Sequence, residues 1–211
     1  MTELVFILDR SGSMSGLEKD TIGGFNSMIA KQRRETGEAL VSTILFDGVS
    51  EVIQDRIPLE QMPTLTEKEY YARGSTALLD AVGNALHHIS MIHKYAREED
   101  RPEKTLFVIT TDGMENSSRQ YTYEGVRAMI RRQKEQYGWE FLFLGANIDA
   151  AAEASRFGIC ADRAADYHCD SVGTALNFDV LADAVCSMRA GRSIDRMWKS
   201  RIAEDYRKRG K

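Results

Sequence analysis

Hydrophobic residues along this chain form short continuous runs that alternate with longer segments of helical spacing. Residues 4–8, Leu-Val-Phe-Ile-Leu, are apolar without interruption, which predicts a strand buried on both faces. A polar loop follows, and residues 17–35 then show the spacing of an amphipathic helix despite the adjacent Gly23 and Gly24. The chain is therefore expected to begin with a strand, a loop and a helix.

The rest of the pattern predicts a hairpin and a series of alternating strands and helices. Asp47-Gly48 separates apolar runs at 39–46 and 49–57, which favours a type I′ turn and one antiparallel edge strand. Further strands are predicted at 104–111, 139–144 and 164–167, and helices at 77–95, 123–137, from about 150 and from 172 onward. This alternation is typical of an α/β, doubly wound (Rossmann-like), mostly parallel sheet with helices on both faces.

Neither an internal repeat nor a Gly-, Ser- or Pro-rich linker divides the 211 residues, so one domain is expected over residues 1–211. The net charge of −4 is uneven, because residues 189–211 contain nine Lys and Arg against three Asp and Glu. Apolar residues recur there at helical spacing and predict an amphipathic helix with a solvated basic face. They are Ile194, Met197, Trp198, Ile202 and Tyr206.

The sequence favours a cytoplasmic protein that makes no use of a membrane. Its apolar runs are far shorter than the roughly 20 residues of a membrane span, and its N-terminus lacks the basic region of a secretory signal. Cys160, Cys169 and Cys186 are odd in number and have no C-x-x-C spacing, which argues against a disulfide framework or a zinc site.

Candidate chemistry gathers in three predicted loops. Ligands of a doubly wound sheet lie outside the carboxyl ends of the strands. The sequence places residues 9–14 (Asp-Arg-Ser-Gly-Ser-Met), 74–76 (Gly-Ser-Thr) and 111–113 (Thr-Asp-Gly) there. Their carboxylates and hydroxyls form an all-oxygen set, which suits a hard divalent cation: Mg²⁺ is expected, with Mn²⁺ or Ca²⁺ as alternatives.

These three motifs, in this order, resemble the von Willebrand factor type A domain and its metal-ion-dependent adhesion site. The resemblance extends from residue 1 to about residue 152. In that family two serines and a threonine contact the metal, the aspartates act directly or through water, and a ligand carboxylate often completes the coordination. The resemblance therefore implies a metal site formed by Asp9, Ser11, Ser13, Thr76 and Asp112.

The resemblance also implies a function. The chain looks like the bacterial, intracellular, stand-alone members of the family, and the metal would capture an Asp or Glu carboxylate of a partner protein. An AAA+ ATPase-associated system is a candidate source of that partner. No enzymatic activity is expected.

Two alternatives remain open. A Mg²⁺-dependent phosphohydrolase would use Asp9 as its nucleophile, but Ser11 stands where such enzymes usually carry an acidic residue, and the loops contain no Lys. Nucleic-acid or acidic-partner binding through the basic tail is the other alternative, and nucleic acid is the less favoured. The histidines within 77–95 are expected to be surface or packing residues.

For several residues near the three loops, the sequence gives only a weak indication of their role. Arg10 either attracts an acidic ligand or pairs with a nearby carboxylate. Glu115 and Asn116 favour helix capping or solvation, and Asn147 and Asp149 favour a turn and a helix start. Asn147 and Asp149 are not expected to be ligands.

Overall fold

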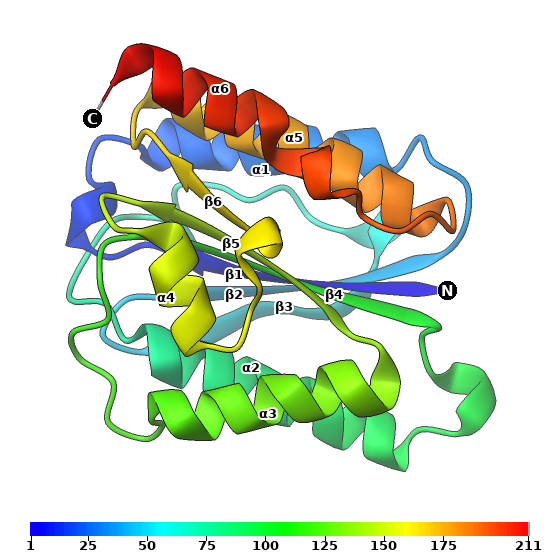
Figure 1. Cartoon of the computed structure of the whole chain (residues 1–211). Helices are drawn as coiled ribbons and strands as arrows, with labels where there is room; N and C mark the ends of the chain where they lie inside the picture. The colour runs from blue at the N-terminus through cyan, green and yellow to red at the C-terminus, as the bar shows by residue number, and fades with distance from the viewer. Residues whose placement is uncertain (211) are drawn as a thin grey trace.

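The computed structural model describes residues 1–210 and contains a six-stranded sheet between two layers of helices (Figure 1). The strand order is β3-β2-β1-β4-β5-β6, and every neighbouring pair is parallel except β2 and β3. The strands are β1 (Thr2–Asp9), β2 (Ala39–Phe46), β3 (Ser50–Pro58), β4 (Lys104–Asp112), β5 (Glu140–Ala146) and β6 (Ala164–Tyr167). The predicted doubly wound, mostly parallel sheet with one antiparallel edge strand is confirmed.

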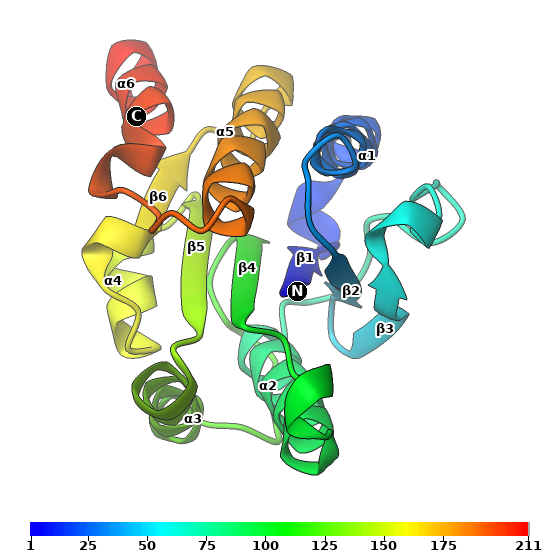
Figure 2. The same ribbon diagram turned by 90° about the vertical axis from the view of Figure 1, so that its right-hand side faces the viewer.

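Helices cover both faces of the sheet, as Figure 2 shows along the strands. One face carries α1 (Glu18–Gln32), α5 (Ser171–Arg189) and α6 (Ser200–Arg209). The other carries α2 (Leu78–Tyr95), α3 (Tyr123–Tyr137) and α4 (Ala150–Arg156). None of the helices within residues 1–210 combines the length and apolar character that crossing a bilayer requires.

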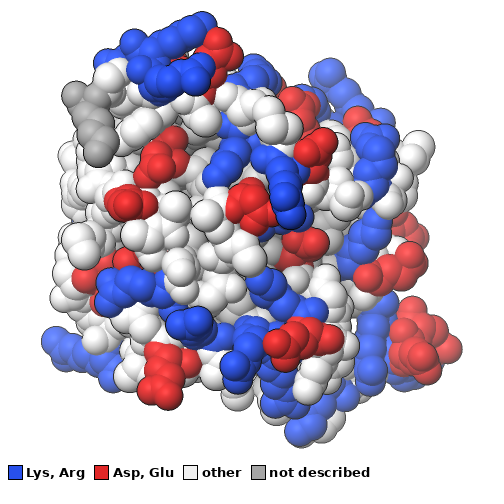
Figure 3. Space-filling model, viewed as in Figure 1, with Lys and Arg blue, Asp and Glu red and all other residues white. Residues whose placement is uncertain are grey.

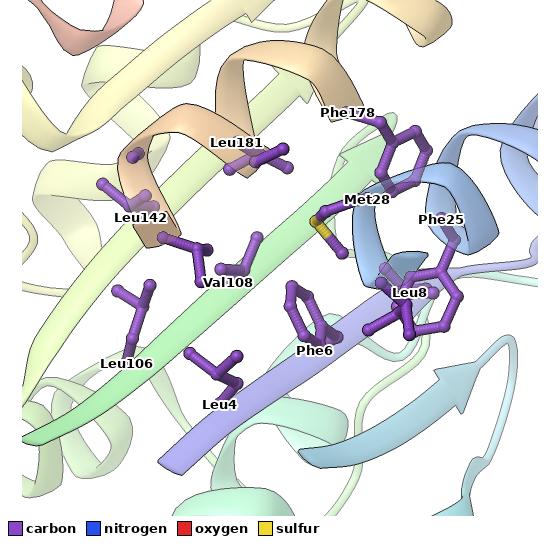
Figure 4. Packing of buried hydrophobic residues seen from close by; sticks show 14 of the residues in the cluster. Leu4, Phe6, Leu8, Phe25, Met28, Leu106, Val108, Leu142, Phe178 and Leu181 are labelled. Carbon is purple, nitrogen blue, oxygen red and sulfur yellow. The ribbon is translucent and has the colours of Figure 1, made fainter. Parts of the chain in front are cut away.

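The apolar run of strand β1 is continuous because both faces of the strand are buried. Leu4, Phe6 and Leu8 pack against the layer that contains α1 and α5 (Figure 4), whereas Val5 and Ile7 pack against the opposite layer. Successive side chains of a strand point to opposite faces, so a central strand covered on both sides needs apolar residues at every position.

The hairpin between β2 and β3 differs from the predicted type I′ turn. Phe46 pairs with Ser50, which leaves a three-residue connection. Neither Asp47 nor Gly48 has the positive φ that a type I′ turn requires. Instead, the Asp47 carboxylate accepts a hydrogen bond of 3.1 Å from the Val49 N–H. This local bond closes the connection without a left-handed backbone.

The basic tail lies against the body of the protein over its described residues, which exclude Lys211. Ile202 of α6 is 1% exposed, whereas Met197 in the preceding 3-10 turn is 67% exposed. Arg201 pairs with Asp179 at 2.7 Å. Further pairs with acidic residues involve Lys208 and Arg209. Part of the tail's positive charge is therefore neutralised within the chain.

Candidate metal centre

The first two predicted loops are joined by their backbones at the carboxyl end of β1. The Gly12 N–H donates to the Gly74 carbonyl at 3.1 Å, and the Arg73 N–H donates to the Arg10 carbonyl at 2.8 Å. A Cβ atom on Gly12 would lie 3.3 Å from the Gly74 oxygen, which is tighter than about nine in ten Cβ contacts in proteins. Glycine at position 12 thus permits this close approach.

Asp9 connects the first loop to the third. Its Oδ1 accepts a 2.7 Å bond from the Ser11 N–H, and its Oδ2 accepts bonds from the Thr111 hydroxyl at 2.9 Å and the Asp112 N–H at 3.0 Å. Burial raises the pKa of the Asp9 carboxyl, while these hydrogen bonds act to lower that pKa. A cation bound nearby would favour the ionised form, because opposite charges stabilise each other in a buried setting.

The hydroxyls of Ser11 and Ser13 lie close enough together to share one small cation. Their Oγ atoms are 2.9 Å apart, and Ser13 Oγ also donates to the Asp112 carbonyl at 2.5 Å. Adjacent ligands of an octahedral Mg²⁺, each about 2.1 Å from the metal, lie about 3.0 Å apart, whereas Ca²⁺ distances would separate them by about 3.4 Å. The 2.9 Å spacing is that of an ordinary hydrogen bond between the two hydroxyls, and it also permits both oxygens to contact one cation of the size of Mg²⁺.

Thr76 is held in place by Asn116. The Thr76 N–H donates to Asn116 Oδ1 at 2.9 Å, and the Thr76 carbonyl accepts from the Asn116 N–H at 3.0 Å. These bonds use the backbone of Thr76 and not its hydroxyl. Sequence reasoning assigned Asn116 to capping or solvation and missed this positioning role. Its place four residues after Asp112 was the only available signal.

Asp112 has a partner that sequence reasoning set aside. Asn147 follows β5, and its side-chain amide donates to Asp112 Oδ1. Asn147 has a φ of 56°, a left-handed conformation that Asn adopts more readily than most residues. The prediction of a turn residue is thus correct, but the same residue also orients the carboxylate. Asp149 behaves as expected, because its side chain caps α4 through the Ala152 N–H.

Glu115 is a capping residue, but for a helix other than the one that follows it. Its Oε2 accepts a 2.8 Å bond from the Leu79 N–H, in the first turn of α2. Its Oε1 accepts bonds from the N–H groups of Ser117 and Ser118. Glu115 therefore ties the loop after β4 to the start of α2, close to Thr76.

Arg10 is buried, and its guanidinium group is bonded to two carboxylates and a backbone carbonyl of the protein itself. It is 1% exposed, and it donates to Asp47 Oδ2 at 2.9 Å, to Glu51 Oε2 at 2.8 Å and to the Glu69 carbonyl at 3.1 Å. Burial acts to raise the pKa of the Asp47 carboxyl, but bonds from Arg73 and Arg10 outweigh it and hold that pKa below its ordinary value. The pairing interpretation of Arg10 is the one that the structure supports.

The structure joins all the loops that carry the predicted ligands. Hydrogen bonds link Asp9, Ser11, Ser13 and Asp112 directly, and Thr76 is connected through its neighbouring loop. Over residues 1–210, no set of three His, Cys, Asp or Glu side chains is arranged to hold a metal ion, so a cation here would depend on hydroxyl oxygens. Metal binding by these residues stays a prediction.

The same geometry bears on the phosphohydrolase alternative. Asp9 is 1% exposed, and both of its carboxylate oxygens accept hydrogen bonds from the protein. A carboxylate nucleophile needs a free oxygen that can approach the substrate. The arrangement of Asp9 suits a structural anchor better than a nucleophile.

No protein-family model and no curated protein sequence matches the chain. Solved structures do resemble it. A von Willebrand factor type A structure from Catenulispora acidiphila aligns with a TM-score of 0.62 and 16% identity, over 88% of this chain and 42% of that one. Proximal thread matrix protein 1 from the mussel byssus, with a zinc-occupied MIDAS motif, aligns with a TM-score of 0.60 and 12% identity, over 88% and 46%.

A third similar structure is the vWF domain of the type V pili tip protein Mfa5 from Porphyromonas gingivalis. It aligns with a TM-score of 0.57 and 10% identity, over 87% of this chain and 94% of that one. This chain spans less than half of the length of the mussel and Catenulispora chains. At these identities the likeness shows the fold, which is of the von Willebrand factor type A kind.

Proposed function

We propose that this protein is a binding module that uses a divalent cation, Mg²⁺, to capture an Asp or Glu carboxylate of a partner protein. The observation that carries the proposal is the junction of three loops around Ser11 and Ser13, whose hydroxyls are 2.9 Å apart. Asp9 accepts a hydrogen bond from the Ser11 N–H, and the Asp112 carbonyl accepts one from the Ser13 hydroxyl. The loop that contains Thr76 is joined to Gly12 through the Gly74 carbonyl.

The donor set explains why such a cation would bind a further ligand. Three of the five proposed ligands are neutral hydroxyls, and Asp9 already accepts bonds from protein groups at both oxygens. With both carboxylates acting through water, the protein oxygens that touch the cation directly would be neutral hydroxyls. The cation would then attract an incoming carboxylate, since Mg²⁺ prefers hard, anionic oxygen ligands.

Metal binding is tested by thermal unfolding across a Mg²⁺ titration after chelator treatment. A ligand that binds only the native state stabilises it by about 2.7 kcal/mol at a hundredfold excess over its Kd. We expect a saturable rise in Tm for the wild type and none for Asp112→Ala or Ser11→Ala. Ser15→Ala is the matched control, because Ser15 is an exposed serine of the same loop outside the proposed ligand set. Equal Mg²⁺ responses in Ser11→Ala and Ser15→Ala would overturn the assignment.

Carboxylate capture is tested with displayed random peptides that bind the immobilised protein in Mg²⁺ and elute with chelator. We expect every eluted peptide to contain an essential Asp or Glu, whose replacement by Asn or Gln abolishes binding. Binding that persists in chelator would contradict the proposal. A screen for Mg²⁺-dependent phosphatase activity tests the enzyme alternative, which predicts turnover that is lost in Asp9→Asn.

We also propose a cytoplasmic location, with an AAA+ ATPase-associated system as a candidate source of the partner. Cys160, Cys169 and Cys186 are all free thiols. Unpaired cysteines are typical of proteins kept in a reducing compartment. Fractionation of cells that express the chain tests the location.

A further inference from the structure

A cavity of about 590 Å³ lies between the C-terminal halves of α2 and α3. Its remaining walls come from the segments that lead into β4 and β5, so it lies at the amino ends of the strands. The three loops of the candidate metal centre lie at the opposite, carboxyl ends. The volume is within the range of about 300 to 1,000 Å³ typical of small-molecule sites.

Positive charge dominates the rim of this cavity. Lys94, Arg101 and Arg132 are exposed and line it, and no Asp or Glu within residues 1–210 does so. None of the three cations forms an ion pair with a described residue. Figure 3 shows many Lys and Arg side chains, with some Asp and Glu among them, along the lower part of the molecule, where Figure 1 places α2 and α3.

The helix dipole explains the position of only one of these three cations. Lys94 lies in the last turn of α2, where a cation interacts favourably with the helix dipole. Arg101 instead lies in the connection before β4, and its Nε donates to the Ala96 carbonyl. Arg132 donates through Nε to Gln136. These bonds leave the terminal guanidinium nitrogens of both arginines available to an anion.

The floor of the cavity is held rigidly from below. His93 Nε2 is bonded to Glu3, a fully buried carboxylate that also pairs with Arg56 at 2.6 Å. The His93 ring packs edge-on against Trp139, with ring centroids 5.2 Å apart, and Trp139 stacks on Phe107. A floor fixed in this way loses little conformational freedom when a ligand binds.

Flat and apolar side chains complete the lining. Met129 and the 55%-exposed Tyr137 come from α3, and Trp139 forms part of the floor. Cationic side chains beside an exposed aromatic ring are the combination with which proteins bind a phosphate that is attached to a base.

We propose that this cavity binds a small organophosphate with a flat ring, the chemistry of a nucleoside monophosphate. Lys94, Arg101 and Arg132 contact the phosphate, and Tyr137 and Met129 pack against the ring. The Arg guanidinium groups supply paired donors to phosphate oxygens. This site is separate from the proposed metal centre and does not depend on its function.

Isothermal titration calorimetry of the full chain in low salt tests the proposal, with AMP, adenosine and inorganic phosphate as probes. We expect AMP to bind saturably with one site per chain, and adenosine and phosphate each to bind at least about tenfold more weakly. Arg132→Gln combined with Lys94→Gln should weaken AMP binding by about tenfold or more. Arg131→Gln is the control, because Arg131 is also an exposed residue of α3 but does not line the cavity.

Three outcomes of this titration would overturn the proposal. No saturable AMP binding up to about 1 mM, a level typical of weak ligands, would overturn the proposal. Equal affinity in the double variant and in Arg131→Gln would also overturn it. Phosphate that binds as tightly as AMP would show that the ring makes no contribution and would overturn the proposal. Circular dichroism of each variant establishes that it is folded.

Discussion

At the residue scale, Arg10 and Asp47 form an ion pair whose side chains are 1% and 7% exposed. Arg73 donates to the same Asp47 oxygen, and Glu51 pairs with the other end of the Arg10 guanidinium. Removing one partner of a buried pair leaves a charge without compensation, which costs more than the pair itself contributes. This cluster lies between the hairpin and the first loop, so it stabilises the support of the candidate metal centre.

This pair gives a prediction about pH. The folded-state pKa of Asp47 is below its ordinary value, so its stabilising contribution is present above the unfolded pKa of about 3.9. That contribution is lost as the pH falls through the folded-state pKa. We expect Asp47→Asn to lower the free energy of unfolding by about 2–3 kcal/mol at pH 7, and the difference from wild type to shrink below about pH 4.

Urea unfolding of both proteins from pH 7 to pH 3 measures that difference. Asp55→Asn serves as control, because Asp55 is a half-exposed residue of the same hairpin and pairs with the half-exposed His88. A gap between wild type and Asp47→Asn that stays constant down to pH 3 would contradict the prediction.

At the element scale, the two adjacent glycines inside α1 have different surroundings. A Cβ atom on Gly24 would lie 2.3 Å from the ring of Phe178 in α5, whereas a Cβ on Gly23 would meet nothing within 4 Å. Gly24 thus permits the close approach of α1 and α5. In the same interface, the ring of Phe178 packs edge-on against the ring of Phe25. Gly23 is exposed and has no such contact.

The adjacent alanine substitutions should therefore change stability in opposite directions. We expect Gly23→Ala to raise the free energy of unfolding by about 0.5–1 kcal/mol, because alanine has the higher helix propensity. We expect Gly24→Ala to lower it by about 1–3 kcal/mol, because the helices must separate or Phe178 must move. Denaturant unfolding measures both, and stabilisation by Gly24→Ala would refute the role given to that contact.

The tail provides a second matched pair. Ile202 packs into the cluster beneath α6, while Met197 is 67% exposed. We expect Ile202→Ala to cost about 2–4 kcal/mol of stability and Met197→Ala less than about 0.5 kcal/mol. Thermal and urea unfolding test the difference. Similar losses in the two variants would mean that α6 does not dock in solution as it does here.

At the scale of the whole molecule, two hydrophobic clusters share one sheet. Trp139 belongs to the cluster under α2 and α3, and Trp198 packs against the cluster under α1 and α5. Because each central strand contributes side chains to both clusters, we expect residues 1–211 to unfold as one cooperative unit.

Single-tryptophan variants test that expectation. Trp198→Phe leaves Trp139 as the fluorophore, and Trp139→Phe leaves Trp198. We expect fluorescence and circular dichroism to give coincident denaturant midpoints within each variant. Midpoints that differ between the two probes would show that the layers unfold separately and would contradict a single domain.

The amino-acid sequence by itself determined the order of strands and helices and the position of the three loops. Strands β1 and β4 are buried on both faces, so their apolar runs are readable without any tertiary information. Parallel strands place their carboxyl ends at one edge, which brought residues 9–14 and 111–113 together. Residues 74–76 precede α2, and backbone hydrogen bonds join their loop to the first one. Local pattern and sheet topology were sufficient for that part of the fold.

Tertiary structure alone decided how those loops are held. Asn147 meets Asp112 across 35 positions of the chain, and Asn116 meets Thr76 across 40. Arg10 contacts Asp47 across 37 positions of the chain. Short polar side chains have several local partners of similar energy, so only the neighbours brought by the folded chain select among them.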